Sequence, residues 1–273
     1  MTVQTVTSAD GTVLAFERFG EGPPVVLVGG ALSTRTAGVP LARHLAGAGM
    51  SAVVYDRRGR GDSGDAPGYA PEREAEDLAA LVAVLGGGGE GPGGDDPSPV
   101  YAFGMSSGGL VVLREAARTG RGLGAVVLFE PPFTGAAGRP QAPNHAALLS
   151  ELVGSDRRGD AVAYFMERIV GLPPQAVEGA RRSPSWEGVK RIAHTLVYDT
   201  TLLGDASLPV ETLAAVDVPV LVVSSRESTP ALREAARVTA EALPRGVHRE
   251  LPGAFHQVPP EQLAPVMREF FVG

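Results

Sequence analysis

The sequence predicts an α/β protein in which a mostly parallel sheet is covered by helices on both faces. Short apolar runs rich in valine recur along the 273 residues, and segments with helical spacing separate them. Continuous apolar runs are typical of strands buried on both faces, and strands alternating with helices indicate right-handed βαβ units. Residues 133–209 interrupt this alternation with helical patterns alone. We therefore expect a core of residues 1–132 and 210–273, with residues 133–209 as a helical cap over the strand ends.

The first third of the chain alternates strand and helix signals. Asp10-Gly11 is a typical hairpin turn between two strand-forming runs, and Pro71 with acidic neighbours marks the start of a helix. The elements predicted here are a hairpin over 3–20, strands at 23–30 and 51–59, and helices at 38–50 and 71–85.

A glycine-rich segment, residues 86–99, separates the first third from the next strand. It lacks the Gly-Lys-Ser/Thr ending of a phosphate-binding loop, and it precedes a strand instead of following one. We therefore expect a flexible surface connection.

The remainder of the chain continues the same alternation on either side of the cap. Strands are predicted at 100–104, 123–130, 218–225 and 247–252, and helices at 106–119, 230–243 and 260–271. Within residues 133–209, helical patterns are predicted over 144–154, 160–171 and 186–203.

The composition narrows the classes of function. The net charge is −7, and the arginines are interleaved with acidic residues instead of forming a basic stripe, so no nucleic-acid partner is expected. The absence of cysteine excludes disulfides, thiolate catalysis and cysteine-ligated metals, and no other metal or organic cofactor is expected. No signal peptide is visible, and no apolar run approaches the ~20 residues of a membrane span. We expect a cytoplasmic protein that binds a small molecule and no membrane; no oligomeric state is predicted.

The segment "GMSSGG" places a candidate nucleophile at a strand–helix junction. Gly104 and Gly108 flank Ser106 in the pattern G-x-S-x-G, whereas Ser107 has Met105 two residues before it. A nucleophilic serine on such a strained turn needs glycine on both sides, because larger side chains would collide with the neighbouring strand and helix. The turn also aims the backbone N–H of Ser107 at the position of a developing oxyanion.

A serine nucleophile needs a base within hydrogen-bonding distance. Among the five histidines, only His256 lies in a loop after the last predicted strand, where catalytic groups commonly collect. The others fall in predicted helices, in the cap or in a strand, at His44, His145, His194 and His248.

Four motifs in order, "VVLVGGAL", "YDRRGRGDSG", "GMSSGG" and "LPGAFHQV", make the chain resemble the α/β-hydrolase fold family over nearly its whole length. The resemblance implies that Ser106 is the nucleophile and His256 the general base. It also implies that the backbone N–H groups of Ser107 and Ala31 form the oxyanion hole. Because the flanking glycines single out Ser106, we expect the position of Ser107 to tolerate other side chains. Asp56 is expected to hold its own turn together. Gly29-Gly30 stands where many members carry His-Gly.

The acid that orients the histidine is not fixed by the sequence. The family usually places an aspartate after the strand "VPVLVVSS", and Ser228 occupies that position here. Glu227, one residue earlier, is one candidate. The other is Glu130 in "LFEPPF", at a strand end that supplies the acid in some members. Glu130 is preferred, with Glu227 as the alternative, because triads are defined by geometry.

These residues predict a serine hydrolase that cleaves a small, apolar ester or related carbonyl compound through an acyl-enzyme. One alternative is a non-hydrolytic enzyme of the same fold, such as a lyase, a cyclase or a cofactor-free proton-transfer catalyst. Another is a ligand-binding protein without activity. Apolar side chains of the cap that could line a pocket, or pack among its helices, are Phe133, Tyr164, Phe165, Met166, Trp186 and Tyr198.

Overall fold

The computed structural model describes residues 2–87, 98–135 and 144–273. Within these residues, eight strands form one sheet in the order β1-β2-β4-β3-β5-β6-β7-β8. Strands β1 and β2 are antiparallel to their neighbours, and every pair from β4 to β8 is parallel. The strands are β1 (Gln4–Thr7), β2 (Val13–Phe19), β3 (Pro24–Val28), β4 (Ser51–Tyr55), β5 (Val100–Met105), β6 (Leu123–Phe129), β7 (Val220–Ser225) and β8 (Gly246–Leu251).

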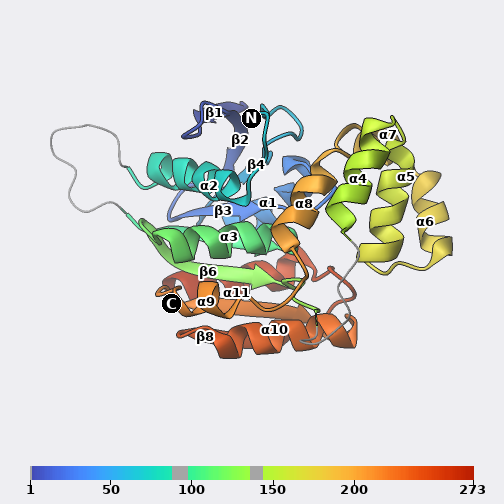
Figure 1. Cartoon of the computed structure of the whole chain (residues 1–273). Helices are drawn as coiled ribbons and strands as arrows, with labels where there is room; N and C mark the ends of the chain where they lie inside the picture. Colours follow the sequence, from blue (N-terminus) through green and yellow to red (C-terminus); the bar gives the residue numbers. More distant parts are fainter. Residues whose placement is uncertain (1, 88–97, 136–143) are drawn as a thin grey trace.

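Helices cover both faces of this sheet (Figure 1). Side chains of α1 (Val39–Gly47) and α11 (Pro260–Val272) share one apolar core with one face of the sheet. Those of α2 (Pro71–Leu85), α3 (Ser107–Arg118) and α10 (Pro230–Ala242) share a second core with the other face. Successive residues of β3 alternate between the two cores, as the two-residue period of a strand requires.

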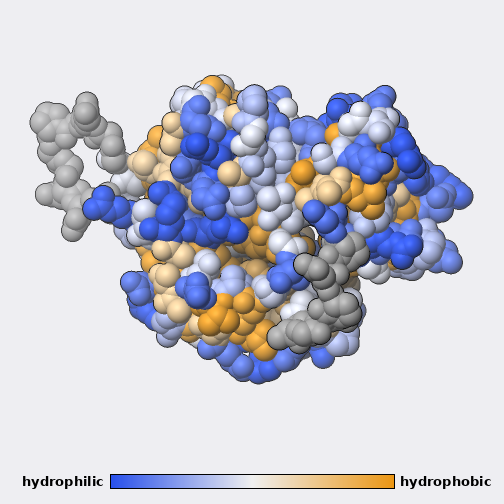
Figure 2. All heavy atoms as spheres, viewed as in Figure 1, coloured by the Kyte–Doolittle hydropathy of each residue, from blue (hydrophilic) through white to orange (hydrophobic). Residues whose placement is uncertain are grey.

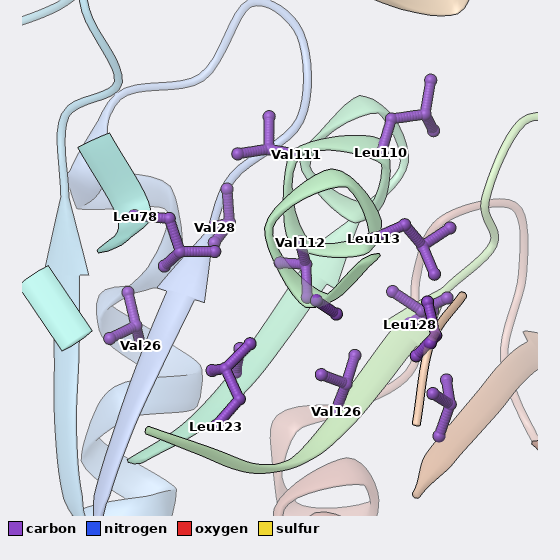
Figure 3. Packing of buried hydrophobic residues seen from close by; sticks show 14 of the residues in the cluster. Val26, Val28, Leu78, Leu110, Val111, Val112, Leu113, Leu123, Val126 and Leu128 are labelled. Carbon is purple, nitrogen blue, oxygen red and sulfur yellow. The ribbon is translucent and has the colours of Figure 1, made fainter. Parts of the chain in front are cut away.

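The central strands are apolar because both of their faces are buried. Val26 and Val28 of β3 and Leu128 of β6 are fully buried, and they meet side chains of α2 and α3 (Figure 3). The predicted α/β class with a mostly parallel sheet is therefore confirmed.

Between β6 and β7 the regular elements of the described residues are all helices. These helices are α4 (His145–Gly154), α5 (Arg158–Tyr164), the π-helical turn η2 (Phe165–Ile169), α6 (Pro174–Arg181), α7 (Trp186–Arg191), α8 (Thr195–Leu203) and α9 (Val210–Ala214). Helices α4 to α7 stand beside the main body, and Figure 2 shows mainly hydrophilic residues on their outer surface. Their own apolar core includes Leu149, Phe165 and Trp186.

We call the described residues between β6 and β7 the insertion. Its helices differ in detail from those predicted for residues 133–209. The single helix predicted over 186–203 is divided into α7 and α8, and the helix predicted over 160–171 passes into η2. Helices α6 and α9 have no counterpart in the prediction. Residues 88–97 of the predicted surface connection, and residues 136–143 of the predicted cap, lie outside the described residues.

Candidate active site

The carboxyl ends of β5, β6 and β7 lie at one level and bring three chain segments together. Met105 is paired with Phe129, and Phe129 with Val223, so Ser106 and Glu130 are the next residues beyond neighbouring strand ends. The N–H of Ser106 donates to the Phe129 carbonyl at 2.9 Å. Sheet register thus fixes where the candidate nucleophile and the preferred acid stand.

Ser106 has a strained backbone, with φ 52° and ψ −124°, and α3 begins at the next residue. A Cβ on Gly108 would lie 2.3 Å from the Val28 carbonyl oxygen, and one on Gly104 would lie 2.5 Å from Gly109 Cα. Glycine is therefore required on both sides of Ser106, because α3 meets the ends of β3 and β5 backbone against backbone. The serine itself is only partly buried.

Glu130 and His256 are in direct contact. His256 Nδ1 lies 2.6 Å from Glu130 Oε2, and the His256 backbone N–H donates to the same oxygen at 3.0 Å. The other carboxylate oxygen accepts the Ser225 N–H at 2.9 Å. Burial raises the pKa of Glu130, but His256 and Ser225 outweigh it and lower this pKa to about 2. Glu130 is therefore a buried carboxylate that stays ionised.

The alternative acid lies elsewhere. Glu227 is exposed, and in the described part of the chain no hydrogen bond or ion pair joins its carboxylate to His256. Its backbone N–H donates to the Gly253 carbonyl at 3.0 Å. The neighbouring Ser228 is buried. The geometry thus brings Glu130, and not Glu227, to the histidine.

The loop after β3 passes against the serine turn. A Cβ on Gly30 would lie 3.2 Å from both Ser106 Cβ and the Met105 carbonyl oxygen. The next residues, Ala31 and Leu32, pack on the apolar core of the insertion. Gly30, the residue before Ala31, thus lies against Ser106.

Positive backbone φ angles cluster in these segments. In residues 2–87, 98–135 and 144–273, six non-glycine residues have positive φ, and four of them are Leu32 (56°), Ser106 (52°), Glu130 (47°) and His256 (49°). Such conformations cost on the order of 1–3 kcal/mol each and persist only where the surroundings impose them. Their gathering at one sheet edge makes that edge the candidate functional site.

The Ser107 side chain is not free, contrary to the expectation from sequence. Its hydroxyl donates to Asp199 Oδ1 of α8 at 2.8 Å. The same carboxylate lies 2.9 Å from Arg57 Nη1 and 2.8 Å from Arg60 Nη2. Arg57 also pairs with Glu74 at 2.5 and 2.7 Å. All five side chains are buried, and we call these residues the buried ion cluster.

None of the four charged members of this cluster is predicted from the sequence as a site residue. The available signal is the density of arginine in "DRRGRG", because a turn that buries arginines needs carboxylates nearby. Local spacing does not name those partners, since Glu74 lies 17 residues and Asp199 142 residues from Arg57.

Asp56 lies where a loop-holding residue is expected. It is fully buried and accepts the backbone N–H groups of Arg35 at 2.7 Å and Asp62 at 3.0 Å. The Arg35 guanidinium also pairs with it. These contacts hold the chain after β4 against the chain after β3.

His145, His248 and most of the aromatic side chains predicted for the cap form other contacts. His145 Nδ1 lies 2.9 Å from the Tyr164 hydroxyl, and His248 Nε2 lies 3.0 Å from Ser224 Oγ. Phe165 and Trp186 are buried in the insertion core, whereas Tyr198 stacks on Tyr69 with ring centroids 4.1 Å apart. Phe133 packs in the main core.

Within residues 2–87, 98–135 and 144–273, no group of three or more His, Asp or Glu side chains is arranged to hold a metal ion. Over the same ranges, no helix is both long and apolar enough to cross a membrane.

Comparisons with known proteins show the family and the fold. An alpha/beta hydrolase from Sphaerobacter thermophilus is 44% identical, with a TM-score of 0.88 over 98% of this chain and 100% of that one. A thermophilic esterase from Thermogutta terrifontis is 26% identical, with a TM-score of 0.71 over 98% and 97% of the two chains. An enol-lactonase from Burkholderia xenovorans is 21% identical and shares the fold, with a TM-score of 0.69 over 99% and 100%. Residues 10–266 match the alpha/beta hydrolase family, and the chain belongs to that family.

Proposed function

We propose that the protein is a serine hydrolase acting on a small, apolar ester or related carbonyl compound. The observation that carries the proposal is the 2.6 Å contact between His256 Nδ1 and a buried, ionised Glu130, beside the strained turn of Ser106. The similarity to an esterase, at 26% identity, supports the same class of reaction. In this proposal Ser106, His256 and Glu130 form the catalytic triad.

The groups act in turn in the proposed reaction. Glu130 accepts the Nδ1–H of His256, which leaves Nε2 free to accept the proton of Ser106. The serine oxygen then bonds to the carbonyl carbon, and the carbonyl electron pair moves onto oxygen as an oxyanion. The N–H groups of Ser107 and Ala31 hold that oxyanion, each donor contributing on the order of 3–4 kcal/mol.

Collapse of the tetrahedral intermediate completes the acylation. The carbon–oxygen bond to the leaving group breaks, and His256 gives its proton to the departing alkoxide. Water then enters, loses a proton to His256 and attacks the acyl carbon, and Ser106 recovers its proton as the acid leaves. The Glu130 carboxylate stays ionised throughout and stabilises the imidazolium that forms twice in each cycle.

The surroundings of Ala31 support an apolar substrate of modest size. Ala31 and Leu32 pack on the insertion core, so the described helices between β6 and β7 are proposed to cap the site with apolar side chains. Polar groups that would bind a charged substrate are instead engaged with one another in the buried ion cluster.

The non-hydrolytic alternative rests on Ser228, which stands where the family usually has an aspartate. The contact of Glu130 with His256 provides the histidine with a carboxylate from another strand, and this favours hydrolysis. The ligand-binding alternative would leave the strained Ser106 backbone without a purpose.

Labelling and turnover together test the proposal. A fluorophosphonate probe is expected to modify Ser106 of the wild-type protein, and p-nitrophenyl esters of two to eight carbons are expected to be hydrolysed with a preference for short chains. Ser106→Ala and His256→Ala should lose both labelling and turnover. A wild-type protein that is neither labelled nor active on any ester of the series would contradict the proposed function.

A further inference from the structure

The peptide group between Gly30 and Ala31 accepts a hydrogen bond from a buried arginine at its carbonyl oxygen. Arg60 Nη1 donates to the Gly30 carbonyl oxygen at 2.6 Å, and Ser33 Oγ donates to the same oxygen at 2.7 Å. A trans peptide is planar, with its C=O and N–H pointing in opposite directions. Fixing the Gly30 oxygen therefore fixes the direction of the Ala31 N–H, which is the proposed oxyanion donor.

We propose that Arg60, anchored by Asp199, is a positioning residue that keeps the Ala31 N–H aimed at the oxyanion. The inference rests on the proposed function, because it concerns the oxyanion hole of that reaction. Arg60 touches neither Ser106 nor His256 by any hydrogen bond in the described residues, so its effect passes through the peptide group.

Arg60 can position this peptide because it is itself held. Its Nη2 lies 2.9 and 2.8 Å from the two oxygens of Asp199, and the side chains are 1% and 2% exposed. Burial raises the pKa of Asp199, but Arg60 and Arg57 outweigh it, so this pKa is lowered and the carboxylate stays charged. A charged donor on the Gly30 carbonyl also polarises the peptide and makes the Ala31 N–H a stronger donor.

The same carboxylate also contacts the side chain of Ser107, the residue whose backbone N–H is the second proposed donor. Asp199 Oδ1 accepts the Ser107 hydroxyl at 2.8 Å, and Arg57 Nη1 contacts Asp199, Ser107 and the Gly29 carbonyl at 2.9, 3.2 and 3.3 Å. Asp199 belongs to α8 of the insertion, whereas the donors follow β3 and β5. One residue of the insertion thus braces both segments of the oxyanion hole.

Stability alone gives a weak account of this arrangement. Buried ion pairs can often be replaced by well-packed apolar side chains with little loss of stability, because desolvation offsets much of their attraction. Arg57, Arg60 and Asp199 of the buried ion cluster contact the segments that carry the two proposed donors. Orientation and polarisation of those donors explain this arrangement better.

The test compares Arg60→Met with a matched variant, Arg58→Met. Arg58 lies in the same turn, is 1% exposed and pairs with Asp77 at 2.8 and 2.7 Å, but it contacts neither Gly30 nor Ser107. Both substitutions remove one buried guanidinium and leave one buried carboxylate with fewer partners. Only the change at Arg60 removes a donor from the Gly30 carbonyl oxygen, which Ser33 Oγ alone then holds.

For p-nitrophenyl acetate, Arg60→Met is expected to lower kcat ~10- to 100-fold, less than removal of a donor outright. KM should change by less than about threefold, because the contact matters in the transition state. The dissociation constant of phenylboronic acid, whose adduct with Ser106 places an oxygen in the oxyanion hole, should rise by the same factor as kcat falls. Arg58→Met should keep kcat within about threefold of the wild type.

Asp199→Asn, with Asp77→Asn as its match, covers the case in which Arg60→Met fails to fold. The expected result is a kcat loss of at least about fivefold for Asp199→Asn alone, since Arg60 loses its charged anchor. Arg60→Lys should recover part of the kcat that Arg60→Met loses.

Equal kcat in the two members of a folded pair, or an unchanged boronate dissociation constant in Arg60→Met, would overturn the inference while leaving the hydrolase proposal intact. A wild-type protein that is neither labelled nor active removes the hydrolase proposal and this inference together.

Discussion

The carboxyl edge of the sheet and its interior differ in backbone conformation and in the polarity of their side chains. In the interior, residues such as Val126 and Leu128 have ordinary strand backbones, apolar side chains and no exposure. At the edge, Ser106, Glu130 and His256 combine positive φ with polar side chains. Residues of the interior have backbone conformations of low free energy. Those at the edge have strained backbones, which the packing around them must hold in place. Substitutions in the interior should therefore change stability, and those at the edge should change rate.

The largest effect is expected for Ser106→Gly. The proposed nucleophile is lost, so turnover should fall by at least about 10⁴-fold. Glycine adopts φ 52° without steric cost, so the free energy of unfolding should stay constant or rise by up to about 1 kcal/mol. Ester hydrolysis and urea unfolding measure the two quantities. Ser106→Ala is the control, because it removes the hydroxyl and keeps the strain.

The next effect separates the two glutamates. Glu130→Gln should lower kcat ~10²- to 10⁴-fold, because an amide cannot stabilise the imidazolium and can favour the wrong tautomer of His256. Glu227→Gln changes an exposed residue and should stay within about twofold of wild type. Steady-state rates on one ester, measured in parallel, decide the question. The reverse order of the two rates would assign the acid to Glu227.

In the interior, Leu128→Ala should lower the free energy of unfolding by about 2–4 kcal/mol, since a fully buried side chain in Figure 3 leaves a cavity. The kcat of the folded protein should remain within about threefold. Urea unfolding, followed by rate measurements well below the transition, tests both parts. A kcat loss as large as that of Glu130→Gln would show that interior and edge are not separable.

The difference between the two regions also determines what the sequence can predict. The helix at Pro71–Leu85 is specified by its local period, by Pro71 and by acidic residues in its first turn, and it lies where it is predicted. The strands lie at the predicted places, but the strand predicted over 51–59 ends at Tyr55. The division of residues 186–203 into α7 and α8 is not visible in that period. There the Thr195 hydroxyl bonds the Ile192 carbonyl at 2.8 Å, and the tertiary packing of short helices overrides the pattern.

For the site, local pattern indicates Ser106 and His256, because each stands at a strand end with a motif around it. The partner of His256 depends on how β6 and β7 stand beside β8, and the sequence left Glu130 and Glu227 open. The ion cluster depends on contacts between residues up to 142 positions apart, which no local spacing encodes.

The smallest effect concerns pH and isolates one group at the edge. The pKa of Glu130 is about 2 in the folded protein, against 4.5 for an ordinary glutamate. The unfolded chain therefore binds the proton more readily, and the stabilisation from Glu130 is complete above pH 4.5 and is lost as pH falls toward 2. Between pH 4.5 and 3.5 the wild type should lose about 1 kcal/mol more than Glu130→Gln. Urea unfolding at the two pH values measures this difference. Parallel pH curves for the two proteins would mean that the Glu130 carboxylate gains nothing from His256 and Ser225 in the folded state, and the proposed orienting role would then lose its electrostatic basis.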